Sequence, residues 1–122
     1  MKSILYIEDD ADFAIGVTQE LLLPNGYSVK HRGSGMPALL EFVKRPNDYS
    51  VVICDHDLPD MDGWEIVKKM REVSQIPIIA FSALLMNNQR MIDYGATVGL
   101  EKVNKAKILE VLKGVMKDEK TV

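Results

Sequence analysis

The chain has 122 residues, of which 47% are hydrophobic and 27% are charged, enough for one globular domain with its own core. Its net charge is −3 and its basic residues form no dense cluster, which argues against direct binding of nucleic acid. A single cysteine, Cys54, excludes an internal disulfide and a cysteine-based zinc site. No apolar run approaches the roughly 18 residues of a membrane span, so we expect a cytoplasmic protein without a signal peptide or a membrane contact.

Five short apolar runs, each bounded by polar or turn-forming residues, predict five β-strands. In chain order these strands cover Ile4–Ile7, Tyr27–His31, Val51–Cys54, Ile76–Phe81 and Thr97–Glu101. The third run shows no polar alternation and stops abruptly at Asp55. This pattern is typical of a strand that is buried on both faces in the centre of a parallel sheet.

Helical spacing of apolar residues between and after these strands predicts five helices. They cover Asp12–Leu23, Pro37–Lys44, Trp64–Val73, Asn88–Tyr94 and Asn104–Met116. Pro24, Asn25 and Gly26 end the first helix, Gly95 ends the fourth, and Asn104 is the expected N-cap of the last. The spacing turns the following residues towards the core: Leu39, Leu40, Val43, Ile66, Val67, Met70, Ile108, Leu109, Leu112 and Val115.

Strands and helices therefore alternate along the whole chain. Such alternation implies right-handed crossovers and a parallel sheet between two layers of helices. We expect a single domain over residues 1–122, with a folded core over 1–116 and a frayed polar tail over 117–122.

Polar residues follow four of the predicted strands. They are Glu8-Asp9-Asp10, Asp55, Ser82 and Lys102. Any one of them could be an ordinary helix cap or loop residue. In a parallel sheet, however, the carboxyl ends of the strands lie at one edge, where α/β proteins bind their ligands. Together, these residues indicate a functional site.

The chemistry of this set points to phosphoryl transfer. Clustered carboxylates repel one another and need a cation to stay ionised, and hard oxygen ligands favour Mg²⁺. A carboxylate such as Asp55 beside that metal can attack phosphorus and form an acyl phosphate. Lys102 and Ser82 would then stabilise further phosphoryl oxygens.

With these residues in these places, the chain resembles the receiver domains of two-component response regulators over nearly its whole length. Receivers carry an acidic pair after the first strand, a switch Ser or Thr after the fourth and a lysine after the fifth. Their phosphorylated aspartate is followed at set intervals by an aliphatic residue, Pro, an acid and Gly. The matching residues are Glu8, Asp9, Asp55, Leu58, Pro59, Asp62, Gly63, Ser82 and Lys102.

The resemblance implies a flavodoxin-like fold, a doubly wound five-stranded parallel sheet of order 2-1-3-4-5. It also implies that Asp55 accepts a phosphoryl group from a phosphohistidine on a sensor histidine kinase or a histidine phosphotransfer protein. Asp9 would bind Mg²⁺ directly, Glu8 through water, and the backbone carbonyl of Asp57 would be a further ligand. Asp10 could be an extra acid of the site or a first-turn helix residue.

By the same resemblance the protein signals through protein–protein contacts and is not an enzyme with a separate substrate. The partner in those contacts would be an output protein. The face around Arg90, Asp93 and Lys105 is the expected contact surface. Asp57 and Leu84 occupy positions that line the mouth of the site in receivers, so we expect them to tune the lifetime of the acyl phosphate.

The chain departs from the receiver pattern at two positions. Val103 follows Lys102 where receivers have a proline joined by a cis peptide, and a cis bond to a non-proline residue costs about 2.5–4 kcal/mol. We therefore expect a trans peptide there. Gly99 occupies the position of the aromatic switch residue, so the usual coupling of a Ser/Thr shift to an aromatic flip cannot operate. Gly99 also predicts a depression that a partner or a neighbouring side chain could fill.

Two alternative functions stay open at this point. Asp55-His56-Asp57 has the Asp-x-Asp spacing of haloacid dehalogenase-like phosphatases, although Leu58-Pro59 and the upstream acidic pair do not fit that family. A receiver-shaped interaction module that is not phosphorylated is the other alternative, and Gly99 and Val103 favour it. We expect Cys54 to be a buried small hydrophobic residue and Trp64 to pack at the start of its helix.

Overall fold

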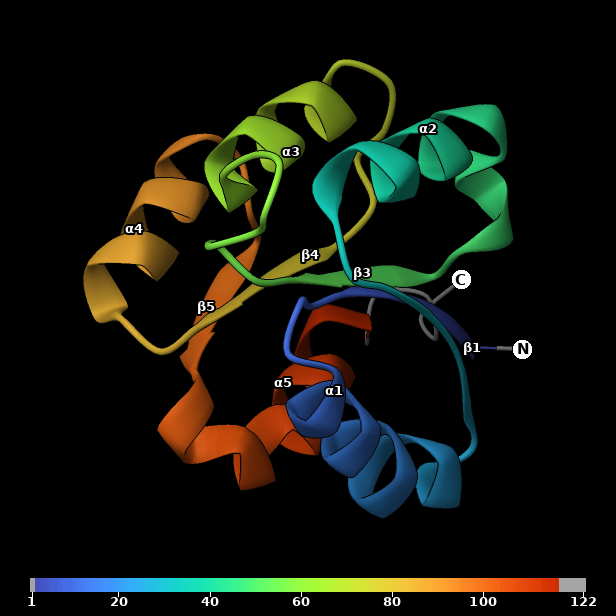
Figure 1. The fold of residues 1–122 in the computed structure, drawn as a ribbon. Helices are drawn as coiled ribbons and strands as arrows, with labels where there is room; N and C mark the ends of the chain where they lie inside the picture. The colour runs from blue at the N-terminus through green and yellow to red at the C-terminus, as the bar shows by residue number, and fades with distance from the viewer. Residues whose placement is uncertain (1, 117–122) are drawn as a thin grey trace.

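A computed structural model describes residues 2–116 of the chain, and the predicted tail over 117–122 lies outside this range. Its strands are β1 Lys2–Ile7, β2 Tyr27–Arg32, β3 Val51–Cys54, β4 Ile78–Ser82 and β5 Val98–Glu101. All neighbouring strands pair in parallel, and their order across the sheet is β2-β1-β3-β4-β5. Figure 1 shows this sheet between two layers of helices, which confirms the predicted doubly wound architecture.

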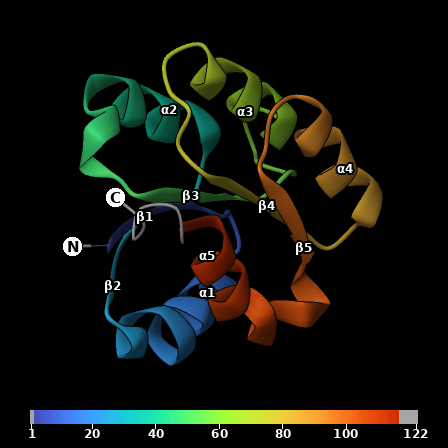
Figure 2. The same cartoon turned by 180° about the vertical axis from the view of Figure 1, so that it is seen from behind.

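The helices are α1 Ala11–Val17, α2 Gly35–Lys44, α3 Gly63–Arg71, α4 Leu85–Asp93 and α5 Ile108–Met116. Helices α2, α3 and α4 cover one face of the sheet, and α1 and α5 cover the other, as Figures 1 and 2 show from opposite sides. The first helical region continues beyond α1 as a π-helical turn over Thr18–Leu22 and a short 3₁₀ segment over Leu23–Asn25. None of the helices in the described part of the chain is long and apolar enough to cross a membrane.

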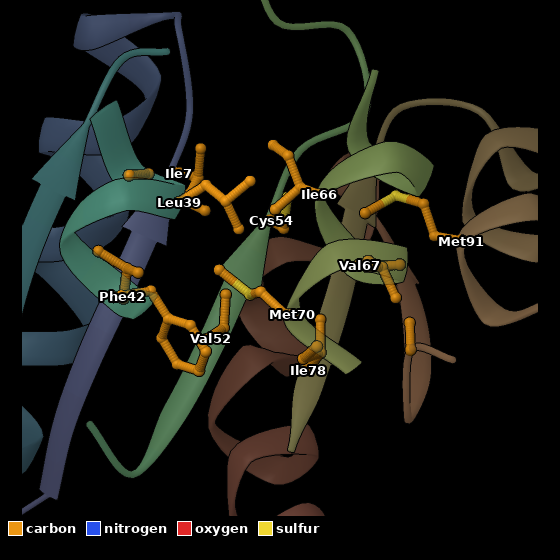
Figure 3. Packing of buried hydrophobic residues seen from close by; sticks show 14 of the residues in the cluster. Ile7, Leu39, Phe42, Val52, Cys54, Ile66, Val67, Met70, Ile78 and Met91 are labelled. Atoms are coloured by element: carbon orange, nitrogen blue, oxygen red, sulfur yellow. The ribbon is translucent and has the colours of Figure 1, made fainter. Parts of the chain in front are cut away.

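Side chains of the central strands alternate between the two layers. On β3, Val52 and Cys54 join the core under α2, α3 and α4, whereas Val51 and Ile53 join the core over α1 and α5. All four side chains are fully buried, which confirms the prediction of a strand covered on both faces and of a buried Cys54. Figure 3 shows the first of these cores, where Met70 of α3 and Phe42 of α2 pack over β3.

The predicted inward face of α3 is correct, but that of α2 is partly wrong. Leu40 and Val43 are 62% and 47% exposed, and only Leu39 of the three predicted residues is buried. Helix α2 instead turns Ala38, Leu39 and Phe42 inward. The Phe42 ring stacks on Tyr49 at 6.1 Å between ring centroids, and burial of this large aromatic surface sets the rotation of the helix.

Two predicted helix starts are also wrong. Asn104 does not cap α5, because it lies inside a 3₁₀ segment over Lys102–Lys107, at a kink with φ −100° and ψ 27°. Helix α4 begins at Leu85, three residues before Asn88. Its first residues, Leu85 and Met86, are 67% and 83% exposed, so the spacing of core residues does not mark the start of this helix.

Candidate functional site

The sheet brings the polar strand ends together at one edge. Ile7 pairs with Cys54 across β1 and β3, Cys54 pairs with Ala80 across β3 and β4, and the backbone N–H of Asp55 donates to the carbonyl of Ile7 at 2.9 Å. Ser82, the last residue of β4, pairs with Glu101, the last residue of β5. Each residue of the predicted site therefore lies at or just beyond the carboxyl end of its strand.

Lys102 joins the two buried carboxylates of this edge. Its Nζ lies 2.7 Å from Oε1 of Glu8 and 3.0 Å from Oδ2 of Asp55. Burial lowers the pKa of the Lys102 ammonium, but the two carboxylates outweigh it, and the net shift of this pKa is upward. The lysine is thus held as a cation between the two acids.

Glu8 is fully buried, and its burial raises the pKa of the carboxyl to about 7, although the contact with Lys102 opposes this rise. The charge of Asp55 adds to the increase. The single Lys102 ammonium therefore does not hold the pKa of Glu8 at its ordinary value. A further cation at this place would relieve the repulsion.

Carboxylate oxygens of Glu8, Asp9 and Asp55 lie within 4.8 Å of one another. Asp9 is exposed, whereas Asp55 is 5% exposed, so the group opens to solvent on one side. Hard oxygen donors with room for water are what Mg²⁺ requires. The donor set present at this edge therefore fits the predicted metal.

Asp10 lies beside the acidic pair but has a helix role. Its Oδ1 accepts from the N–H of Phe13 at 3.0 Å and so caps α1, and its own N–H donates to Oε2 of Glu8 at 3.1 Å. The structure thus gives Asp10 a helix role as the N-cap, one residue before the first turn, and its role as an extra acid of the site stays a prediction. The Phe13 ring, which the sequence did not single out, lies 5.0 Å from Nζ of Lys102 in a cation–π contact.

Comparison with known proteins decides the family. The model of the response regulator receiver domain matches residues 4–113. This chain belongs to that family, the receiver domains of two-component response regulators. The match favours a receiver over a haloacid dehalogenase-like phosphatase.

Individual relatives agree with the family model. The transcriptional regulatory protein AfsQ1 of Streptomyces coelicolor is 37% identical over 103 residues, which cover 83% of this chain and 41% of that protein. Among solved structures, the chemotaxis protein CheY4 of Vibrio cholerae is 30% identical with a TM-score of 0.81, and 94% of this chain and 98% of that chain are covered. The response regulator TrrA of Thermotoga maritima, solved in complex with Mg²⁺ and BeF, is 25% identical with a TM-score of 0.84 over 94% of this chain and 99% of that one.

The chain spans well under half the length of the curated relatives that it matches, from 34% to 43% of the first ones. The activities of those longer proteins are properties of the whole proteins, and this chain corresponds to less than half of each. Receiver domains as a family take part in signalling with sensor histidine kinases and bind Mg²⁺ in their acidic pocket.

Ser82, which the resemblance to receivers predicts as the switch residue, is 2% exposed and tightly held. Its Oγ accepts from the N–H of Leu84 at 3.4 Å. The side-chain amide of Asn88 binds the Ser82 backbone on both sides, since Oδ1 accepts from its N–H at 2.9 Å and Nδ2 donates to its carbonyl at 3.4 Å. This role of Asn88 was not predicted from the sequence. The available signal was a polar residue one turn before Met91, on the buried face of a helix.

Asp57 and its neighbours form a separate group. The Asp57 side chain is 75% exposed, and its Oδ1 lies 3.0 Å from Nδ1 of His56, which is itself buried. With Asp62, these residues make a second set of close potential ligands. The predicted use of the Asp57 backbone carbonyl as a metal ligand stays a prediction, as does the tuning role of Asp57 and of Leu84, which is 59% exposed.

The two departures from the receiver pattern have visible consequences. No peptide bond within residues 2–116 is cis, so Lys102–Val103 is trans as expected, and Val103 is 84% exposed. A Cβ on Gly99 would lie 3.0 Å from Cβ of Asn88 and 3.4 Å from Cδ1 of Ile92. Neighbouring α4 side chains therefore occupy much of the predicted depression, and a pocket of about 180 Å³ remains between α4 and β5.

Proposed function

We propose that this receiver accepts a phosphoryl group on Asp55 from a phosphohistidine donor, with Mg²⁺ held by Glu8, Asp9 and Asp55. The observation that carries the proposal is the Lys102 ammonium, 3.0 Å from Asp55 and 2.7 Å from Glu8 at the carboxyl edge of the sheet. A nucleophilic carboxylate, a fixed cation and a set of hard oxygen ligands meet there.

In the proposed step, a carboxylate oxygen of Asp55 attacks the phosphorus atom. An O–P bond forms while the N–P bond of the donor breaks, and its electron pair stays on the imidazole, which leaves as a neutral ring because its other nitrogen carries a proton. When bound, Mg²⁺ supplies charge neutralisation for the phosphoryl oxygens and the acids. Lys102 stays beside Asp55 and neutralises one phosphoryl oxygen, while the hydroxyl of Ser82 donates to another.

The donor we propose is a sensor histidine kinase or a histidine phosphotransfer protein, and the output is a protein–protein contact. Support comes from the family match and from an open groove of α4 that Arg90 and Asp93 line. Lys105, the third residue of the predicted contact surface, lies 5.6 Å from the Phe13 ring and so close to the site itself.

The decisive experiment is intact mass spectrometry after incubation with phosphoramidate, whose N–P bond resembles that of phosphohistidine, and Mg²⁺. We expect the mass of one phosphoryl group on the wild type, none on Asp55→Asn and none in EDTA. Asp57→Asn is the matched control because it removes an acid two residues away and should still be phosphorylated. No gain in mass under any condition would instead favour the non-phosphorylated interaction module.

A further inference from the structure

Asn88 lies in the first turn of α4, against the end of β4, and is 2% exposed. Its amide makes both of its hydrogen bonds to one residue, the backbone of Ser82, at 2.9 and 3.4 Å. A buried amide that accepts from the N–H and donates to the carbonyl of the same residue fixes the position of that backbone. Ser82 is thereby attached to a side chain of α4 as well as to its own strand.

The attachment closes into a small ring of contacts. The Ser82 hydroxyl accepts from the N–H of Leu84, the residue before α4, and the Leu84 carbonyl accepts from the N–H of Asn88 at 3.2 Å. Displacement of Ser82 must therefore either break two buried hydrogen bonds or carry the first turn of α4 with it. Breaking them would leave polar groups unsatisfied inside the protein, which is unfavourable for each group.

Gly99 of β5 makes this arrangement possible. A Cβ there would lie 3.0 Å from Cβ of Asn88, closer than ordinary van der Waals contact. Any larger side chain would need still more of the space that Asn88 fills. Because Gly99 has no side chain, the aromatic switch residue is absent from β5, and the Asn88 amide can occupy this space.

We propose that Asn88 couples the switch residue Ser82 directly to α4 and takes over the role that an aromatic residue on β5 cannot fill here. The proposal rests on phosphorylation of Asp55. When the Ser82 hydroxyl turns to a phosphoryl oxygen, it leaves the N–H of Leu84, and the Asn88 amide transmits the displacement of Ser82 to α4. The position of α4 then reports the state of Asp55.

The chain contains a built-in reporter of α4. Trp64, its single tryptophan, lies in α3, and its ring centroid is 4.6 Å from that of Tyr94 at the end of α4. The guanidinium of Arg90, also on α4, lies 4.9 Å from the Trp64 ring. Movement of α4 against α3 changes both contacts and hence the fluorescence of Trp64.

The test measures Trp64 fluorescence while Mg²⁺ and beryllofluoride, a phosphoryl mimic, are added. Wild type and Asn88→Leu are compared, since Leu keeps the approximate volume but cannot bond to Ser82. Asn87→Leu is the matched control, because it places the same side chain one position earlier on α4. A melting shift measured in parallel reports binding of the mimic independently of α4.

We expect both variants to bind the mimic, Asn87→Leu to keep the wild-type fluorescence change and Asn88→Leu to lose most of it. Gly99→Ala provides a second approach from β5, because its Cβ would push Asn88 aside, and it should reduce the change as well. A full fluorescence change in Asn88→Leu, or in Gly99→Ala if Asn88→Leu does not fold, overturns the proposal. Failure of the wild type to bind the mimic at all would instead overturn phosphorylation of Asp55 and the coupling with it.

Discussion

Glu8 is a buried acid whose negative charge is only partly compensated by its surroundings. The fold removes this carboxyl from water and gives it one ammonium, which it shares with Asp55. The second buried acid therefore has no counter-charge of its own among the described residues. A cation bound beside these acids would offset their repulsion. The arrangement therefore favours the cation-bound protein over the cation-free protein.

This imbalance predicts how the metal-free protein responds to pH. The pKa of Glu8 in the folded protein is about 7, above its ordinary value of 4.5, so the folded state holds this proton more tightly than the unfolded state. The favourable contribution is complete below pH 4.5 and is lost as the pH rises through about 7. Glu8→Gln, which imitates the protonated acid, should flatten the decline.

The measurement is the free energy of unfolding from urea titrations in EDTA at several pH values between these limits. Asp12→Asn serves as the control, because it removes an exposed acid from the first turn of α1. A wild-type stability that rises over this window, or an equally steep decline in Glu8→Gln, would contradict the argument. Saturating Mg²⁺ should offset the decline, since the metal binds the ionised carboxylates.

At the level of single elements, two glycines show how differently helix positions are constrained. Gly63 begins α3, and a Cβ there would lie 2.5 Å from the carbonyl oxygen of Asp55 and 2.8 Å from Cα of His56. Gly16 lies inside α1 with nothing within 4 Å of the same added atom. The first glycine permits α3 to start directly against the end of β3, whereas the second has no such role.

We therefore expect opposite signs for two identical substitutions. Gly16→Ala should raise the free energy of unfolding by about 0.5–1 kcal/mol, because Ala favours the helix and restricts the unfolded chain. Gly63→Ala should lower it by about 1–3 kcal/mol through backbone displacement and should also slow phosphorylation of Asp55. Chemical denaturation of both variants measures the signs, and a neutral Gly63→Ala would show that the loop after β3 adapts freely.

The elements also show what the sequence could and could not predict. The strands were found because central strands of a parallel sheet are apolar on both faces, and this leaves a plain signal. The rotation of α2 was missed because Leu40 and Val43 are apolar but exposed, so hydrophobic spacing alone could not tell the buried side from the open one. The start of α4 was missed for the same reason, since its first residues, Leu85 and Met86, are also apolar but exposed.

For the molecule as a whole, topology explains why the residues of the site were easier to predict than the contacts that join them to other elements. Parallel strands place their carboxyl ends at one edge, so Glu8, Asp55 and Lys102 could be grouped before any contact was known. Asn88 and Phe13 act across elements, from α4 to β4 and from α1 to the residue after β5. Such contacts depend on how layers pack, and the order of residues along the chain does not encode them locally.

The two cores share one sheet, and this predicts a single cooperative unfolding transition. Ile53 is fully buried in the core over α1 and α5, whereas Trp64 packs against the other core. Ile53→Val should lower the free energy of unfolding by about 1 kcal/mol. Because the layers unfold together, the denaturation midpoint followed by Trp64 fluorescence should fall as far as the midpoint followed by far-UV circular dichroism.

Val67→Ala, in the core that Trp64 contacts, is the companion variant and should move both midpoints equally as well. If Ile53→Val shifted the circular dichroism midpoint while the Trp64 midpoint stayed in place, the two layers would unfold separately. Separate unfolding would mean that packing on one face of the sheet does not stabilise the other face. A shared transition would show instead that the helices on both faces unfold together with the sheet as one unit.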